Sequence, residues 1–368
     1  MIDLDRNSTD SEIIDWLRFP LAVIVVAIHS VCSYNSKDIS YFIHNEIILR
    51  IGGLAVPVFF FLSGYLLFSK YNRFGRREYK ILLKNKFYSL LLPYILWNAM
   101  MFYAMWISGR TEYDYSPYNL YRIFWAYSPA VHVESILGYD FLDYSAPVIK
   151  PLWFIRDLFM IVLISPVIWW ISILSGKWSF LLWVFPYILS IGIPLDMFGI
   201  ISLCFVSLGA SFAIHGISLN IFCKKYWKFI FSLFVILSTV EYFSILSDPY
   251  GILSRVNTVL GVLSVLCIAR IAVLYGKSKE TMIKLGEMAF FIYVTHEFIG
   301  IRSVHHIAEA LCDIEGWGGT AGLLVDIILR VAICIGLYNL LKRLSPNTLN
   351  ILSGGRVNKR KIRNMSLG

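Results

Sequence analysis

IDWLRFPLAVIVVAIHSVCSY, residues 14–34, decides the fold class, because an unbroken apolar run lies in it between one arginine and one histidine. A helix of about 20 residues covers about 30 Å, which is the thickness of the hydrocarbon core of a bilayer. The residues before this run are acidic and polar, and no small-residue cleavage site follows it. We therefore expect a retained membrane span and not a removable signal peptide.

The rest of the chain repeats this pattern. Of its 368 residues, 58% are hydrophobic and only 15% are charged, whereas a soluble domain carries about 25% charged residues. The sequence predicts an all-α, polytopic transmembrane bundle, with a membrane domain over residues 1–345 and a basic cytoplasmic tail over residues 346–368. We expect about ten spans, at 14–34, 47–69, 87–108, 152–175, 178–195, 198–215, 227–247, 253–275, 284–302 and 321–342.

Basic residues indicate the orientation of these spans. Seven of the 17 residues in 70–86 are Lys or Arg, and further basic residues lie near 216–228, near 276–284 and in the tail. All of these segments fall on one side of the membrane if both termini are cytoplasmic, as the positive-inside rule requires. The same sidedness explains the net charge of +9, so no nucleic-acid partner is needed; the lipid bilayer is the expected partner.

Arg18 and His29 are the first candidate functional residues, because charged groups inside a membrane are costly and usually have a task. They are eleven residues apart, which at about 100° per residue places both on one helix face, about 16 Å apart along the axis. A single histidine is most often a core residue, but in lipid its imidazole needs a partner within the protein. An imidazole near neutral pKa is also the usual acceptor of a hydroxyl proton.

Later spans contain further candidates for substrate binding. Arg156 forms an ion pair with Asp157 in one interpretation, and positions a phosphate or acyl oxygen in the other. His296 either orients His29 or helps to bind an acceptor. The substrate-binding candidates are Arg156, His296, Trp153, Ser63 and Glu297.

Neither a metal site nor a bound cofactor is expected. The sequence HEFIG that begins at His296 is not HExxH, so it does not predict a zinc protease. The six cysteines are scattered without zinc spacing. Cys32 and Cys312 share the outer side in the predicted topology, and whether they form a disulfide stays open. The long outer segment 109–150 is rich in aromatic residues, which predicts either an ordered cap at the interface or a sugar-binding surface.

Four motifs in this order resemble the acyltransferase-3 family of membrane proteins. The first is Arg-x10-His in DWLRFPLAVIVVAIHS, with Arg18 and His29. It is followed by a Ser-Gly motif in VPVFFFLSGYLLF (56–68) and by PLWFIRDLFMIVLISPVI (151–168). The last is LGEMAFFIYVTHEF (285–298), which ends near His296.

This resemblance implies a ten-span enzyme of the bacterial inner membrane, without the appended SGNH hydrolase-like domain of two-domain members. It would transfer an acyl group, usually acetyl from cytoplasmic acetyl-CoA, to a hydroxyl of an envelope glycan or lipid-linked sugar. His29 would be the catalytic histidine, as general base or as acyl carrier, and Arg18 its paired arginine.

Two alternatives to an enzyme remain at this stage. An exporter of a polysaccharide or lipid-linked sugar would use Arg and His to line a path, although the paired broken repeats of many transporters are not visible. A structural subunit of a glycan-assembly complex would leave the buried charges unexplained. The sequence also leaves open whether the chain forms a homo-oligomer.

Overall fold

The computed structural model describes residues 4–30, 39–108, 123–125, 146–189, 199–243, 251–298, 301, 304–312 and 317–356, with side chains from residue 9 onward. Within these ranges the chain is helical and contains no strand, which confirms the all-α prediction. Both the first and the last described segments are helical. A long apolar helix is the expected outcome in lipid, because it satisfies its own backbone hydrogen bonds.

The first half of the chain forms nine numbered helices within the described residues. These are α1 (Leu4–Ile28), α2 (Ile39–Phe42), α3 (Leu49–Gly52), α4 (Ala55–Phe68), α5 (Arg76–Lys86), α6 (Leu92–Ile107), α8 (Trp153–Leu163), α9 (Ser165–Ser175) and α10 (Ser179–Leu189). The second half continues with α11 (Ile200–Ile214), α12 (Leu219–Phe243), α13 (Ile252–Tyr275), α14 (Lys279–Leu285), α15 (Ala289–Thr295), α17 (Val304–Cys312), α18 (Gly318–Leu344) and α19 (Pro346–Leu352).

Five stretches of the described chain are long and apolar enough to cross a membrane, and there are six if the pair α11 and α12, bent by 118°, counts as one span. The five are Ile39–Phe68, Arg76–Ile107, Ser165–Leu189, Ile252–Tyr275 and Gly318–Leu344. They support a multi-pass arrangement, while the total of ten spans stays a prediction.

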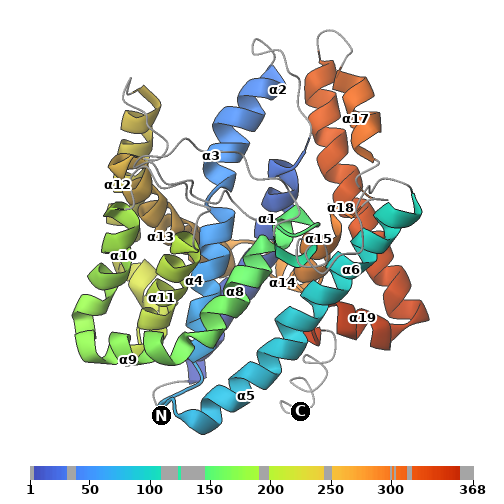
Figure 1. Ribbon diagram of the computed structural model, residues 1–368. Helices are drawn as coiled ribbons and strands as arrows, with labels where there is room; N and C mark the ends of the chain where they lie inside the picture. The colour runs from blue at the N-terminus through green and yellow to red at the C-terminus, as the bar shows by residue number, and fades with distance from the viewer. Residues whose placement is uncertain are drawn as a thin grey trace, which may run out of the picture.

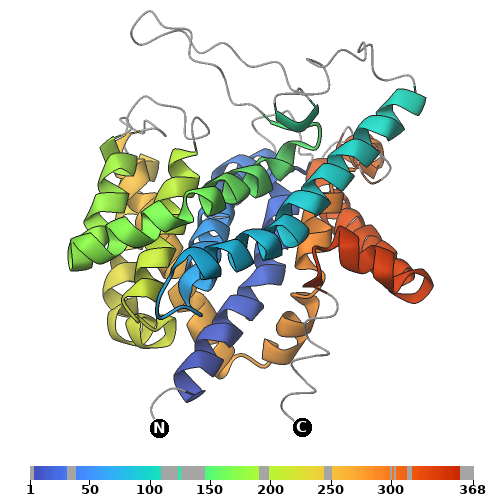
Figure 2. The same cartoon turned by 60° about the horizontal axis from the view of Figure 1, so that its bottom comes forward.

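Helix α1 is the central element of the bundle. It contacts α4, α13, α14, α15 and α18, and two groups of helices flank it, α10 to α12 on one side and α17 to α19 on the other (Figures 1 and 2). The start of α1, the basic helix α5 and α19 lie toward one end of the molecule, and α2 and α17 lie toward the other (Figure 1). The positive charge of α5 is therefore at the same end as the start of α1.

The predicted span 284–302 is not one continuous helix in the structure. It is divided between α14 and α15, with turns from Gly286 to Met288. A Cβ on Gly286 would lie 2.7 Å from the carbonyl oxygen of Asp15 in α1, so the chain packs closely on α1 at this break. The result is that α15 is a short helix whose end lies inside the bundle.

Helices α4 and α11 cross at two glycines. A Cβ on Gly64 would overlap the carbonyl oxygen of Val206, and a Cβ on Gly209 would overlap that of Phe61. Glycine at such positions lets two helix backbones approach closely, as is common in membrane bundles. The Ser-Gly motif of the sequence therefore serves helix packing through Gly64.

We expect Gly64→Ala to destabilise the protein by about 1–3 kcal/mol, because the crossing cannot accept a methyl group without a backbone shift. Gly336→Ala is the matched control, since a Cβ on this glycine of α18 meets no atom within 4 Å. Thermal unfolding of both variants in detergent measures the difference. Equal stability of the two variants would show that the α4–α11 contact is looser than described.

Candidate active site

His29 and His296, which come from opposite ends of the sequence, lie side by side. Their ring centroids are 5.5 Å apart, and the ring planes are inclined by 33°. His29 follows the last residue of α1, where its N–H bonds to the carbonyl oxygen of Val26 at 3.1 Å, and its side chain is exposed. His296 caps the C-terminus of α15 and is fully buried. The exposed imidazole of His29 therefore lies beside the buried imidazole of His296.

The surroundings of His296 determine which of its nitrogen atoms carries the proton. Its Nδ1 lies 2.9 Å from the carbonyl oxygen of Tyr293 and 3.2 Å from that of Ile292. A carbonyl oxygen can only accept a hydrogen bond, so Nδ1 is the protonated nitrogen of the neutral ring. Nε2 then carries a lone pair, and among the described residues no group hydrogen-bonds to it. Such a fixed tautomer is typical of a histidine that orients a neighbouring group.

Arg330 of α18 connects its own helix to the end of α15 and to α17 through buried polar contacts. Its Nε donates to Asp326 at 2.7 Å, and its Nη1 donates to Glu297 at 2.7 Å. Its Nη2 lies 2.6 Å from Nδ1 of His305 in α17, and the same Nδ1 lies 3.2 Å from Asp326. Arg330 and Asp326 are almost completely buried. Since Glu297 follows His296 in the chain, this cluster holds the end of α15 in place.

We expect Asp326→Asn to destabilise the fold by about 3 kcal/mol, because it removes one partner of a buried ion pair and leaves Arg330 poorly compensated. The control is Glu46→Gln, which breaks the pair of Glu46 with Arg50 on a helix surface where the Arg50 side chain is 42% exposed; a loss of at most about 1 kcal/mol is expected there. Thermal unfolding in detergent compares the two. Equal losses would contradict the structural role given to the Arg330 cluster.

Arg156 is anchored within the protein. Its Nη2 lies 2.9 Å from the carboxylate of Asp157, its Nη1 donates to the carbonyl oxygen of Trp125 at 3.0 Å, and its guanidinium lies over the Trp125 ring. This is the ion-pair interpretation of the two that the sequence allowed. Arg156 thereby attaches residues 123–125, which belong to the aromatic outer segment, to α8. Most of that segment lies outside the described residues.

The start of α8 and the turn before it pack against Tyr293, three residues before His296. The Tyr293 hydroxyl donates to the carbonyl oxygen of Pro151, and its ring lies 5.7 Å from that of Phe154. Trp153 begins α8 with its ring 6.0 Å from that of Phe60 in α4. Ser63 is half-buried in the same helix α4. The predicted site residues of α4, α8 and α15 therefore lie on elements that pack together.

Arg18 lies near the middle of α1, eleven residues before His29. Its Nη1 lies 2.9 Å from the carboxylate of Asp15, and its side chain is 42% exposed. The structure thus separates the two candidates of the first motif along α1, with Arg18 nearer the basic end of the molecule. Cys32 lies outside the described residues. No group of His, Cys, Asp or Glu in the described part of the chain has the arrangement of a metal site.

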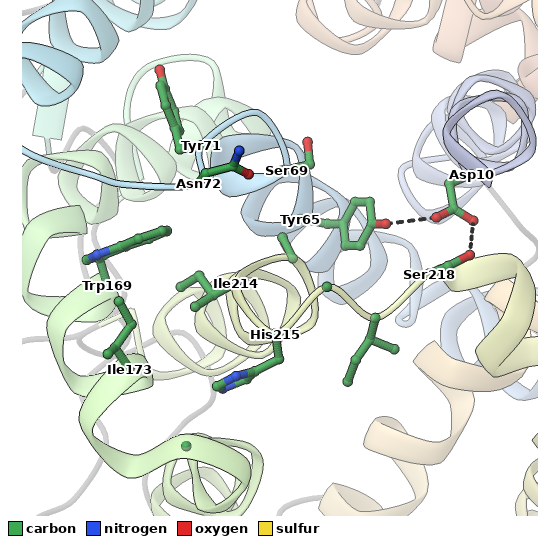
Figure 3. A pocket seen from close by; sticks show the side chains of 14 residues that line it. Asp10, Tyr65, Ser69, Tyr71, Asn72, Trp169, Ile173, Ile214, His215 and Ser218 are labelled. Atoms are coloured by element: carbon green, nitrogen blue, oxygen red, sulfur yellow. Dashed lines mark hydrogen bonds between the residues drawn. The ribbon is translucent and has the colours of Figure 1, made fainter. Parts of the chain in front are cut away.

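A cavity of about 660 Å³ opens at the basic end of the molecule, between α4, α9 and the turn after α11. Figure 3 shows Trp169 and Tyr71 on one side of it and Asp10 on the other, bonded to Tyr65 and Ser218. Asp10 is 19 residues before His29 in the sequence, or about 28 Å along a helix. The cavity is therefore separate from the histidine pair.

Comparison with known proteins decides the family. A model of the acyltransferase-3 family, described as an acyltransferase domain, matches residues 12–339. The chain belongs to this acyltransferase family. The resemblance seen in the four motifs is confirmed, and the family together with the apolar helices makes the chain a multi-pass membrane acyltransferase.

The chain is also similar to the succinoglycan biosynthesis protein ExoH of Rhizobium meliloti (strain 1021). The two are 23% identical over 328 residues, which covers 86% of this chain and 82% of that protein. No solved structure matches the chain. The match to the family therefore rests on sequence, and the geometry of the histidine pair comes from this structure.

Of the residues in the Arg330 cluster, only Glu297 was among the predicted site residues, and the structure places it in an ion pair with Arg330. Asp326 and Arg330 are four residues apart within a span, and this spacing places both on one helix face. That spacing was a usable signal for an ion pair. The sequence held no signal that Glu297 and His305, from two other segments, would meet them.

Proposed function

We propose that this protein is a membrane O-acyltransferase of the bacterial inner membrane. It moves an acyl group, most simply acetyl, from cytoplasmic acyl-CoA to a hydroxyl of an envelope or capsular polysaccharide or of its lipid-linked precursor. Membership of the acyltransferase family supports the reaction class. The name of the relative, a succinoglycan biosynthesis protein, supports a polysaccharide acceptor.

The observation that carries the proposal is the contact of His29 with His296. His29 is accessible at the end of α1, and its ring lies against a buried imidazole whose proton is fixed on Nδ1. A base that is oriented by a second group in this way is a general feature of acyl-transfer sites. His29 is therefore the group that handles the proton, and His296 positions it.

In the proposed reaction, His29 is the single group that accepts and returns the proton. His29 takes the proton of the acceptor hydroxyl as the oxygen attacks the thioester carbonyl; the C–S bond then breaks, and the proton passes to the thiolate to give free CoA. In the second route the His29 nitrogen attacks the thioester first and carries the acyl group to the hydroxyl. Acyl-protein formed before acceptor is added would select the second route.

The two substrates approach His29 from opposite sides. The basic helix α5 lies at the same end of the molecule as the start of α1 (Figure 1), and Arg18 lies on that side of His29 along α1, where cationic side chains suit the phosphates of CoA. The acceptor enters from the side of α17, toward His296, Glu297 and the start of α8. This division requires no permanently bound cofactor.

We expect His29→Ala to reduce acyl transfer by a factor of about 10² to 10⁴, because the hydroxyl loses its proton acceptor. Release of free CoA thiol from acetyl-CoA by membrane vesicles containing the protein measures the reaction. His306→Ala is the matched control, since the His306 side chain is 78% exposed; its activity should equal that of the wild type. Wild-type transfer by His29→Ala would contradict both routes, and wild-type vesicles that release no thiol would favour an exporter.

A further inference from the structure

The chain folds back under the bundle after α18. Helix α19 begins at Pro346, packs on α6, and its last residue Leu352 accepts a hydrogen bond from Nε1 of Trp97 at 3.1 Å. Residues 346–356, which the sequence placed in a basic tail, are thus part of the packed structure. Residues 357–368 lie outside the described chain.

Two glycines turn the chain after α19 back toward α6. Gly354 has φ = +66° and Gly355 has φ = +75°, a conformation that glycine adopts without a steric penalty. A Cβ on Gly354 would overlap the carbonyl oxygen of Ser89, which lies in the π-helical turn Phe87–Leu91 that precedes α6. Gly354 therefore cannot be replaced without a clash, and the turn places Arg356 beside Ser89.

Arg356 is held in place by backbone and ring contacts. Its Nη1 donates to the carbonyl oxygens of Ser89 at 3.1 Å and Ser353 at 2.7 Å. Its guanidinium carbon lies 3.6 Å from the centroid of the Phe290 ring in α15. The ion pairs of the described residues leave Arg356 without a carboxylate partner. Its positive charge is therefore fixed in position, and no carboxylate of the described residues neutralises it.

A second arginine lies at this level of the bundle. Gly286 lies on Asp15 and His296 lies beside His29, so Phe290, between them in the chain, faces the part of α1 that contains Arg18. Burial, followed by the charge of Arg18, lowers the pKa of Arg356 to about 9, so the guanidinium remains charged at neutral pH. Arg18 is paired with Asp15, but two guanidinium groups close together still repel each other, which raises the free energy of the empty protein. An anion that binds both of them removes that cost.

The geometry points to Arg356 and Arg18 as a two-arginine site for the diphosphate of the acyl donor, with the C-terminal turn as part of the donor site. This inference rests on the proposed function. Arginine binds phosphate oxygens through two parallel N–H groups. Arg18 is about 16 Å along α1 from His29, a distance that the flexible arm between the diphosphate and the thioester would cover.

The cavity of Figure 3 is the competing place for the donor phosphates. The described residues that line it include neither Lys nor Arg, and they include the carboxylate of Asp10. That carboxylate accepts hydrogen bonds from the backbone N–H groups of Leu219 and Asn220 at the start of α12. The cavity therefore offers a diphosphate neither lysine nor arginine, with His215 as its one basic side chain among the described residues, and Arg18 with Arg356 is the better site.

The test measures binding of CoA to the full-length protein in nanodiscs of neutral lipid. We expect Arg356→Ala to weaken CoA binding about tenfold, which corresponds to about 1.4 kcal/mol, and to raise KM for acetyl-CoA equally with kcat unchanged. KM for acetyl-pantetheine, which lacks the diphosphate, should stay at the wild-type value. Arg343→Ala is the matched control, because it removes an exposed arginine from the end of α18.

Equal CoA affinity of Arg356→Ala and Arg343→Ala would overturn the inference, as would a wild-type protein that does not bind CoA. If phosphatidylglycerol stabilised the wild type but not Arg356→Ala while CoA affinity was equal, Arg356 would bind a lipid headgroup instead. Arg356→Lys retains the charge and should lose less affinity, which keeps the test valid if the alanine variant does not fold. CoA binding without thiol release from acetyl-CoA would reject the proposed function alone.

Discussion

The compensation of buried charge is the constraint on which the arrangement of the site depends. An arginine inside an apolar bundle is stable only if opposite charges and acceptors surround it, and Arg330 meets this condition with Asp326 from its own helix and Glu297 from beyond α15. Because Glu297 is the neighbour of His296, the ion pair also fixes where α15 ends. His296 then lies against His29 at the end of α1.

Close backbone contacts fix the positions of the helices that carry these residues. Gly286 lets the turn before α15 lie on α1, and Gly64 lets α4 lie on α11. The break that divides α14 from α15 is therefore not a weakness of the bundle. It makes α15 a short helix that ends at His296, where the carbonyl oxygens of Ile292 and Tyr293 lie beside Nδ1 and determine the histidine tautomer.

The sequence was sufficient for the fold class and the family, and it singled out both histidines as candidates. The long apolar runs and the clustering of basic residues are local properties of the sequence. His29 and His296 lie in motifs that can be recognised from the sequence alone. The contacts between distant segments were not accessible in this way. That Arg330 meets His305, or that Arg356 returns to Ser89 through a pair of left-handed glycines, depends on packing that no local pattern encodes. The break at Gly286 was missed because the apolar character continues through it.

The central claim is that His29 and His296 act as one unit, with His29 handling the proton and His296 positioning it. A double-mutant cycle on acyl transfer tests this most directly, using His29→Gln, His296→Gln and the double variant so that residual rates stay measurable. If the two residues form one unit, the double variant should be no slower than the slower single variant, because the effects of groups that act together are not additive. Losses that multiply in the double variant would contradict the account.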